Sequence, residues 1–193
     1  MCIRDRVHIR SYNPPTKPEN HQVSRAVDAI LASERPVIYA GGGTISSNAS
    51  KELRELNDLI DAPVTNTLMG LGVFPGTHKR FLGMLGMHGT YQANMAMHNA
   101  DLIIALGARF DDRITNAPDK FAPRAKVIHF DVDHSSVSKI IEADIAVFGQ
   151  IKDSLQAINN HLKTKIDEID NEKLAPWHQQ ISDWKEKHGL NHD

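Results

Sequence analysis

The stretch DLIIALGARFDDR, residues 101–113, decides the fold of this chain. Its first half, residues 102–107, is a short aliphatic run that is apolar on both of its faces. Such a run is typical of a buried strand in a parallel sheet. Two arginines and two aspartates follow within a few positions: Arg109, Asp111, Asp112 and Arg113. Charges gathered at the carboxyl end of a core strand predict a ligand site, because ligands of parallel sheets bind at that edge.

Four other segments are short, apolar and rich in β-branched residues: RPVIYA (35–40), APVTNT (62–67), AKVIHFDVD (125–133) and DIAVFG (144–149). Apolar residues recur at helical spacing between them, so we expect helices at about 21–31, 46–60, 90–99 and from 151 onward, with a short helix at 135–141. The glycine-rich stretch 68–89 is expected to be irregular. Strands that alternate with helices predict an α/β fold, a doubly wound parallel sheet of Rossmann-like type.

Composition bounds the class of protein. The 193 residues are 40% hydrophobic and 24% charged, with a net charge of −2, which is typical of one ordinary soluble domain with flanking segments. There is no basic field for nucleic acid, no run of the roughly 20 apolar residues that a membrane span needs, and no secretory signal. Cys2 is the single cysteine, which excludes an internal disulfide and a multi-thiolate zinc site. We therefore expect a cytoplasmic protein without nucleic-acid or membrane partners, and no metal site.

The same features divide the chain. Residues 1–20 are interpreted as a linker, with three prolines in YNPPTKP and an opening hexapeptide (1–6) that we regard as foreign to the domain. Residues 21–163 form the domain, and the polar residues 164–193 form a second linker. Trp177, Ile181 and Trp184 share one helical face in that linker. Because no surface for this face is evident in the sequence, we expect a partner domain outside the chain.

Each strand end carries residues suited to a ligand. Glycines let a backbone approach a ligand closely, and carboxylates accept hydrogen bonds from ribose hydroxyls. The strand ends therefore predict a cleft for a dinucleotide or a similar extended cofactor; their residues are Gly41, Gly42, Gly43, Asn66, Thr67, Leu68, Gly107, Ala108, Arg109, Asp131, Val132, Asp133, Gly149 and Gln150.

Each of these signals also has a simpler interpretation. The three glycines could be a plain turn, since GxGxxG is absent. Asp131 and Asp133 could cap a helix, and Met84 and Met87 could be core residues. His88 could support a loop. The RFDDR cluster could be a patch of surface ion pairs, although such pairs contribute only about 0–1 kcal/mol each.

Four blocks carry a resemblance to a known family: AGGGTISSNASKEL (40–53), PVTNTLMGLGVFP (63–75), FLGMLGMHGTYQANMAMHNADLIIALGARFDDR (81–113) and HFDVDHSSVSKIIEADIAVFG (129–149). Together they closely resemble the central domain of the acetolactate synthase large, catalytic subunit, over roughly residues 7–190. The resemblance implies a three-domain parent enzyme that depends on thiamine diphosphate and magnesium. That parent condenses pyruvate with pyruvate or 2-oxobutyrate, with loss of CO2, in the synthesis of valine, leucine and isoleucine.

The resemblance places the thiamine-activating glutamate and the magnesium-bound diphosphate in domains that this chain lacks. We therefore expect no catalytic residue in the chain and no activity of the chain alone. The parent would be a homo-oligomer of the full-length subunit with a regulatory small subunit. Two alternatives are the central domain of another thiamine-diphosphate carboligase or of a pyruvate oxidase, and a stand-alone nucleotide-binding module. An NAD-dependent deacylase of related fold is disfavoured, because its zinc cysteines are absent.

By the same resemblance, the domain binds FAD in an essentially structural role. The implied contacts along the FAD are Gly41, Gly42, Gly43, Thr67 and Leu68; those beside the flavin are Met87, His88, Gly89 and Thr90; those near the diphosphate and flavin are Gly107, Arg109, Asp111 and Arg113; and those toward the adenosine are Asp131, Val132, Asp133, Gly149 and Gln150. The family often has Gly-Asp where this chain has Gly149-Gln150.

The resemblance also implies a substrate channel. Arg113, braced by Asp112, resembles the arginine that receives the carboxylate of the second 2-oxo acid, and Met87 would form the apolar wall beside it. The same residues resemble those at which acetolactate synthase herbicides bind.

Overall fold

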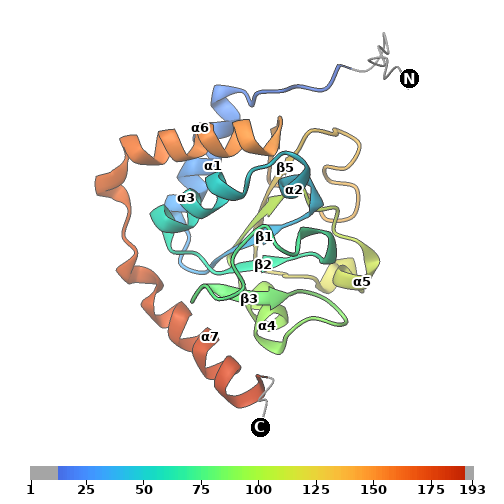
Figure 1. Ribbon diagram of the computed structural model, residues 1–193, viewed down its shortest axis with the longest axis vertical. Helices are drawn as coiled ribbons and strands as arrows, with labels where there is room; N and C mark the ends of the chain where they lie inside the picture. Colours follow the sequence, from blue (N-terminus) through green and yellow to red (C-terminus); the bar gives the residue numbers. More distant parts are fainter. Residues whose placement is uncertain (1–12, 190–193) are drawn as a thin grey trace, which may run out of the picture.

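The computed structural model describes residues 13–189 and shows a six-stranded parallel sheet with helices on both faces (Figure 1). The strand order is β3-β2-β1-β4-β5-β6, and all neighbouring strands run parallel. The strands are β1 (Pro36–Ala40), β2 (Val64–Asn66), β3 (Phe81–Met84), β4 (Leu102–Leu106), β5 (Lys126–Asp131) and β6 (Ile145–Phe148). The predicted doubly wound fold is confirmed, and its strand order reverses between β1 and β4.

The helices form one layer on each face of the sheet. One layer holds α1 (Asn20–Ala32), α3 (Ser50–Ile60) and α6 (Ile151–Thr164), and the other holds α4 (Tyr91–Asn99) and α7 (Ala175–His188). Two short helices, α2 (Gly42–Ser46) and α5 (Asp112–Thr115), follow β1 and β4. Single 3-10 turns occur at Leu68–Gly70, Pro118–Lys120, Ile166–Glu168 and Glu172–Leu174.

Each central strand contributes to two cores, because successive side chains point to opposite faces. In β1, Ile38 and Ala40 face the core beneath α1, α3 and α6, whereas Val37 and Tyr39 face the core beneath α4 and α7. All five β1 residues are buried. Burial on both faces is the reason that these strands are apolar without interruption.

Three local expectations are wrong. The helix expected at 46–60 begins later, at Ser50, with Ala49 as its N-cap, and the short helix α2 ends at Ser46. The stretch 68–89 is not wholly irregular, because it contains β3, which pairs with β2. Residues 135–141 form turns instead of a helix. There the Asp133 carboxylate accepts a hydrogen bond from the Ser135 amide at 2.9 Å, and Ser138 has a φ of 58°. Both features interrupt a helical path.

The C-terminal helix α7 packs on this domain, so the expectation that its apolar face lacks a surface is wrong. Trp177 and Ile181 are buried in the core that also contains Ala93 and Ala96 of α4. The indole N–H of Trp177 donates to the Pro36 carbonyl at 3.2 Å. Residues 175–188 are therefore part of the packed structure on the side of α4.

The segment before α7 makes hydrogen bonds to the ends of α1 and α3. Asn171 donates to the Leu59 carbonyl at 3.1 Å, and the Lys173 ammonium donates to the Leu31 carbonyl. These two acceptors lie in the last turns of α3 and α1, where carbonyls lack partners within the helix. We call residues 169–188 the strap.

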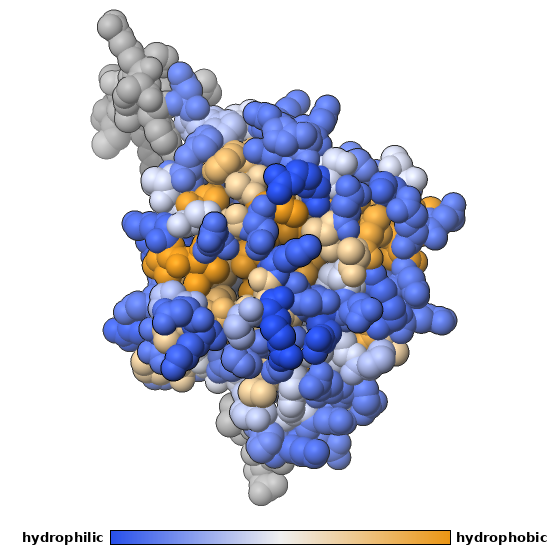
Figure 2. Space-filling model, turned by 180° about the vertical axis from the view of Figure 1, so that it is seen from behind, coloured by the Kyte–Doolittle hydropathy of each residue, from blue (hydrophilic) through white to orange (hydrophobic). Residues whose placement is uncertain are grey.

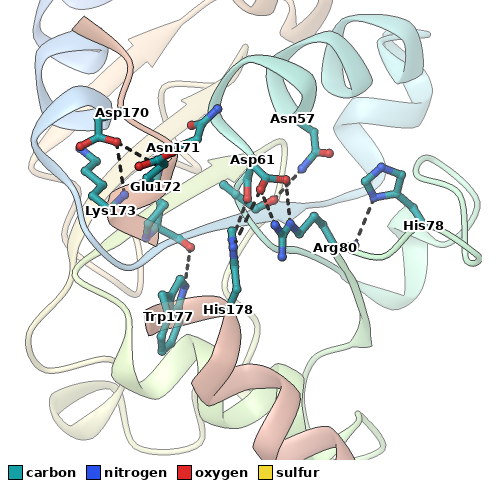
Figure 3. A network of polar contacts seen from close by, with 12 residues as sticks. Asn57, Asp61, His78, Arg80, Asp170, Asn171, Glu172, Lys173, Trp177 and His178 are labelled. Atoms are coloured by element: carbon teal, nitrogen blue, oxygen red, sulfur yellow. Dashed lines mark hydrogen bonds and ion pairs between the residues drawn. The ribbon is translucent and has the colours of Figure 1, made fainter. Parts of the chain in front are cut away.

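Asp61, the C-cap of α3, holds the strap and β3 together (Figure 3). Its carbonyl lies 3.0 Å from His178 Nε2, and its carboxylate accepts two hydrogen bonds from Arg80, that from Nε at 2.7 Å. The strap thus packs on the domain predicted for 21–163, while a further domain beyond it stays a prediction. The hexapeptide 1–6 lies outside the described residues. No helix within residues 13–189 is long and apolar enough to cross a membrane.

Candidate functional site

A cleft of about 790 Å³ opens at the carboxyl ends of the central strands. Its volume lies within the roughly 300–1,000 Å³ that is typical of small-molecule sites. Twelve of the residues that the resemblance assigns to the site line it: Gly42, Gly43, Thr67, Leu68, Met87, His88, Gly107, Arg109, Asp111, Asp112, Arg113 and Asp131. They come from segments as far apart as residues 42 and 131, so the fold brings distant blocks to one edge of the sheet.

The remaining predicted residues do not line the cleft: Gly41, Gly89, Thr90, Val132, Asp133, Gly149 and Gln150. Thr90 is the N-cap of α4, where its hydroxyl accepts from the Ala93 amide at 3.3 Å. The amide of Gly41 donates to the Leu106 carbonyl at 2.9 Å. Thr90 and Gly41 therefore stabilise the backbone next to the cleft through these hydrogen bonds.

Asp131 and Asp133 have different surroundings. Asp131 lines the cleft, and its Oδ1 accepts from the Asp133 amide at 2.9 Å. The Asp133 carboxylate accepts from the Ser135 amide and hydroxyl and from the Ser136 hydroxyl, and these bonds lower its pKa. Asp133 therefore stabilises its own turn, as the capping interpretation suggested, whereas Asp131 is exposed to a ligand.

Gly149 and Gln150 lie where the N-terminal linker meets α6. The Gln150 amide donates to the Thr16 carbonyl at 3.0 Å. A Cβ on Gly149 would lie 3.0 Å from the Pro18 nitrogen. The linker therefore covers this position on one side.

Two glycine turns touch each other at the floor of the cleft. Gly107 has a φ of 57°, in the left-handed region, and a Cβ added there would lie 2.6 Å from Gly43 Cα. A Cβ on Gly43 would lie 2.8 Å from Gly107 Cα. Real Cβ atoms do not come this close to backbone, so side chains are excluded at both positions. The three glycines after β1 are therefore more than a plain turn, because they let two strand ends pack backbone to backbone.

This contact leaves polar backbone groups at the floor. Within residues 13–189, no hydrogen bond uses the amide N–H of Gly42, Ala108 or Arg109. Free amides at a glycine turn and at the start of a helix suit an anionic ligand. The backbone of this floor can therefore bind phosphate oxygens.

Phe110 orients the charged cluster. Its side chain is 1% exposed, and its ring centroid lies 5.5 Å from that of Tyr39 and 5.4 Å from that of His129. Its φ of 54° is unusual for an aromatic residue. With Phe110 anchored inward, its neighbours Arg109 and Asp111 are exposed to the cleft.

The charges of the cluster are only partly paired. Arg109 Nη2 lies 3.2 Å from Asp111 Oδ2, and both side chains are more than half exposed, so the pair contributes about 0–1 kcal/mol. The predicted contact between Asp112 and Arg113 is not formed. Arg113 has no acidic partner within the described residues and is exposed. Its guanidinium is therefore free to bind an incoming anion.

Apolar side chains also line the cleft. Leu68, Met69 and Met87 are 68%, 74% and 70% exposed, although each is a large hydrophobic residue. Exposed apolar side chains that gather at one cleft indicate a binding surface. Seen from behind, the molecule shows a band of apolar residues across its middle, with polar residues above and below (Figure 2). Apolar residues are therefore present on the surface of the molecule as well as in its core.

Several lining residues were not predicted. Met69 lies in the glycine-rich stretch whose structure the sequence left undefined, and Ser136 lies in the segment expected to be helical. Tyr39 is buried at the cleft, its hydroxyl has no partner within the described residues, and burial raises its pKa. An aromatic residue near the end of the aliphatic strand 35–40 was the available signal for Tyr39.

Comparison with known proteins gives a consistent result. Residues 23–158 match the family described as thiamine pyrophosphate enzyme, central domain. The chain is 50% identical over 187 residues to an acetolactate synthase large subunit of Buchnera aphidicola subsp. Schlechtendalia chinensis, covering 97% of this chain and 33% of that protein.

It is 44% identical over 187 residues to the acetolactate synthase isozyme 3 large subunit of Escherichia coli (strain K12), with 97% and 33% covered. It is 48% identical over 147 residues to the acetolactate synthase of Mycobacterium bovis (strain ATCC BAA-935 / AF2122/97), with 76% and 24% covered. The chain thus spans a third or less of the length of these relatives.

Proposed function

Because the chain belongs to the family of thiamine pyrophosphate enzyme central domains, we propose that it is the FAD-binding domain of an acetolactate synthase large subunit. The observation that carries this proposal is the cleft of about 790 Å³ at the switch point between β1 and β4. Extended cofactors bind at this position in open α/β sheets.

The chemistry of the cleft supports a flavin dinucleotide. The free amides of Gly42, Ala108 and Arg109, together with the Arg109 guanidinium, suit a diphosphate. Asp131 provides a carboxylate for ribose hydroxyls. The exposed side chains of Leu68 and Met69 suit the face of a large aromatic ring system.

The full-length subunit would condense two 2-oxo acids, pyruvate with pyruvate or 2-oxobutyrate, in branched-chain amino-acid synthesis. Thiamine diphosphate, held with magnesium by domains outside this chain, would supply the nucleophilic carbon. This chain would orient the second acid. Arg113 would bind its carboxylate through bidentate hydrogen bonds, and Met87 would pack against its alkyl group. We also propose a cytoplasmic homo-oligomer that assembles with a small regulatory subunit, because the relatives are named large subunits.

Replacement of Arg113 in the full-length subunit tests this role. We expect Arg113→Ala to raise the KM for the second 2-oxo acid by about tenfold or more, since a charge-assisted hydrogen bond is worth about 1.5–3 kcal/mol. Steady-state kinetics with pyruvate and 2-oxobutyrate measure the change. Arg124→Ala is a matched control, because Arg124 is an exposed arginine that contacts Asn99 and does not line the cleft.

An unchanged KM in Arg113→Ala would contradict the carboxylate role. The isolated 193-residue chain is expected to form no acetolactate with added thiamine diphosphate and magnesium. Turnover of pyruvate by that chain would contradict the proposal that other domains bind thiamine diphosphate and magnesium.

A further inference from the structure

We infer that Asn94 of α4 is a positioning residue that fixes Met87 relative to Arg113, which lies beside it at the cleft. The Asn94 side chain binds both backbone groups of Gly86, the residue before Met87. Its Oδ1 accepts from the Gly86 amide at 3.0 Å, and its Nδ2 donates to the Gly86 carbonyl at 3.1 Å. The inference rests on the proposed function, because it concerns the substrate end of the same cleft.

Gly86, which Asn94 binds, also lies against the backbone of Arg113. It is buried, its φ of 106° lies in a region that side chains rarely adopt, and a Cβ there would lie 3.0 Å from the Arg113 carbonyl oxygen. The next amide, that of Met87, donates to the same carbonyl at 3.2 Å. Two consecutive residues of the loop therefore contact the backbone of α5, and Asn94 fixes the first of them.

The side chains beyond this contact have little else to hold them. Met87 and His88 are exposed, and Arg113 has no acidic partner within residues 13–189. The distance between the Met87 and Arg113 side chains therefore depends on the contact that the backbone of Gly86 and Met87 makes with the backbone of Arg113. Loss of the Asn94 hydrogen bonds would leave the Gly86 amide without its acceptor and weaken the loop next to Met87, where the bond from the Met87 amide to Arg113 would remain.

Asn94 does not line the cleft itself, so it acts through Met87 and not on a ligand. Asparagine is also a poor residue for the middle of a helix, and α4 gains nothing from Asn94 that alanine would not supply better. Asn99 in the same helix is a matched control. Its side chain binds the Met95 carbonyl at 2.9 Å and Arg124 at 3.2 Å, away from the loop.

The kinetic test uses the full-length, flavin-loaded subunit. We expect Asn94→Ala to raise the KM for the second 2-oxo acid about fivefold to tenfold, the effect of one to two ordinary hydrogen bonds. The kcat should stay unchanged, because Asn94 does not line the cleft and contacts no reacting group. Asn99→Ala should change none of these. Asn94→Asp keeps the acceptor for the Gly86 amide only, and should give an intermediate KM.

A double-mutant cycle separates positioning from a general loss of stability. If Asn94 acts through Met87, Asn94→Ala should have little further effect on KM in a Met87→Ala background. Additive effects would overturn the inference. So would an unchanged KM in Asn94→Ala, or a rise in KM that is accompanied by a large fall in the melting temperature, as a residue needed only for folding would produce.

A second readout does not depend on activity. Hydrogen exchange at the Gly86 amide should become faster in Asn94→Ala and stay unchanged in Asn99→Ala, because Asn94 is the acceptor of that amide. Equal exchange in the three proteins would overturn the inference. If the full-length subunit formed no acetolactate at all, the proposed function would fail, and this exchange experiment would still decide the role of Asn94 in the loop.

Discussion

Gly107 is the residue on which the floor of the cleft depends most directly. It combines a φ of 57° with an approach to Gly43 that leaves no room for a Cβ. We expect Gly107→Ala to destabilise the domain and to lower its affinity for FAD by about tenfold or more. Gly72→Ala is the matched control, because Gly72 has a φ of 91° but open space around it. It should cost only the left-handed strain of about 1–2 kcal/mol and leave FAD binding intact.

Urea unfolding and a flavin-fluorescence titration measure both quantities for the two variants. Equal FAD affinity in Gly107→Ala and the unchanged protein would mean that the contact between the two glycine turns does not form the ligand site.

A buried histidine predicts how stability depends on pH. His129 on β5 is 1% exposed, and its burial lowers its pKa, although the nearby Asp131 carboxylate opposes this shift. The unfolded chain therefore binds more protons than the folded one as the pH falls below about 6.5. The stability that comes from neutral His129 is fully present above that pH and is lost as the pH decreases toward the folded-state pKa.

We expect the free energy of unfolding to fall between pH 7 and pH 5, by at most about 1.4 kcal/mol per pH unit from one such group. His129→Leu should reduce this slope, and His21→Leu, at an exposed histidine, should not. His178 adds to the slope, since burial lowers its pKa as well. Urea unfolding at three pH values is the measurement, and an unchanged slope in His129→Leu would be the contrary result.

At the scale of elements, α7 is the clearest case in which packing decides the role of a segment. Trp177 is 2% exposed, donates a hydrogen bond to Pro36 and contacts Trp184 edge to face at 5.8 Å. Trp177→Ala should lower the free energy of unfolding by about 3–5 kcal/mol, as for other buried large-to-small changes. Trp184→Ala, at a partly exposed residue of the same helix, should cost clearly less. Equal, small losses in both variants would show that α7 is not seated on α4.

Elements with a strong apolar pattern could be predicted from the sequence. The strands around residues 36–40 and 102–106 are aliphatic on both faces, and α6 has a clear stripe ending at Leu162. By contrast, β3 is short and contains Gly83, so it lacks a strand pattern. The seat of α7 is made of alanines on α4, whose short side chains give little signal of a binding surface. The turn at 134–142 depends on side-chain hydrogen bonds from Asp133, which periodicity does not report.

The candidate site was predictable to a similar degree. Strand ends gave Gly42, Gly107 and Arg109, because the edge of a parallel sheet gathers them. Met69 and Tyr39 were not predicted as site residues, because their exposure and orientation depend on tertiary packing. The contact from Asn94 to Gly86 escaped for the same reason, since a side chain that reaches from a helix to a loop leaves no period in the sequence.

At the scale of the whole molecule, the two edges of the sheet differ. The strap covers the ends of α1 and α3 at the amino edge, with Lys173 and His178 bound to carbonyls there. The carboxyl edge is open, with Met69 and Met87 exposed at the cleft. The cleft therefore lies at the edge of the sheet that the strap leaves open.

We propose that this open cleft binds FAD. Titration of the 193-residue chain with FAD, followed by flavin fluorescence at constant ionic strength, tests it most directly. We predict saturable binding of one FAD per chain that Gly107→Ala weakens and Gly72→Ala preserves. Absence of saturable binding in the unchanged chain, or equal binding by all three proteins, would contradict the account.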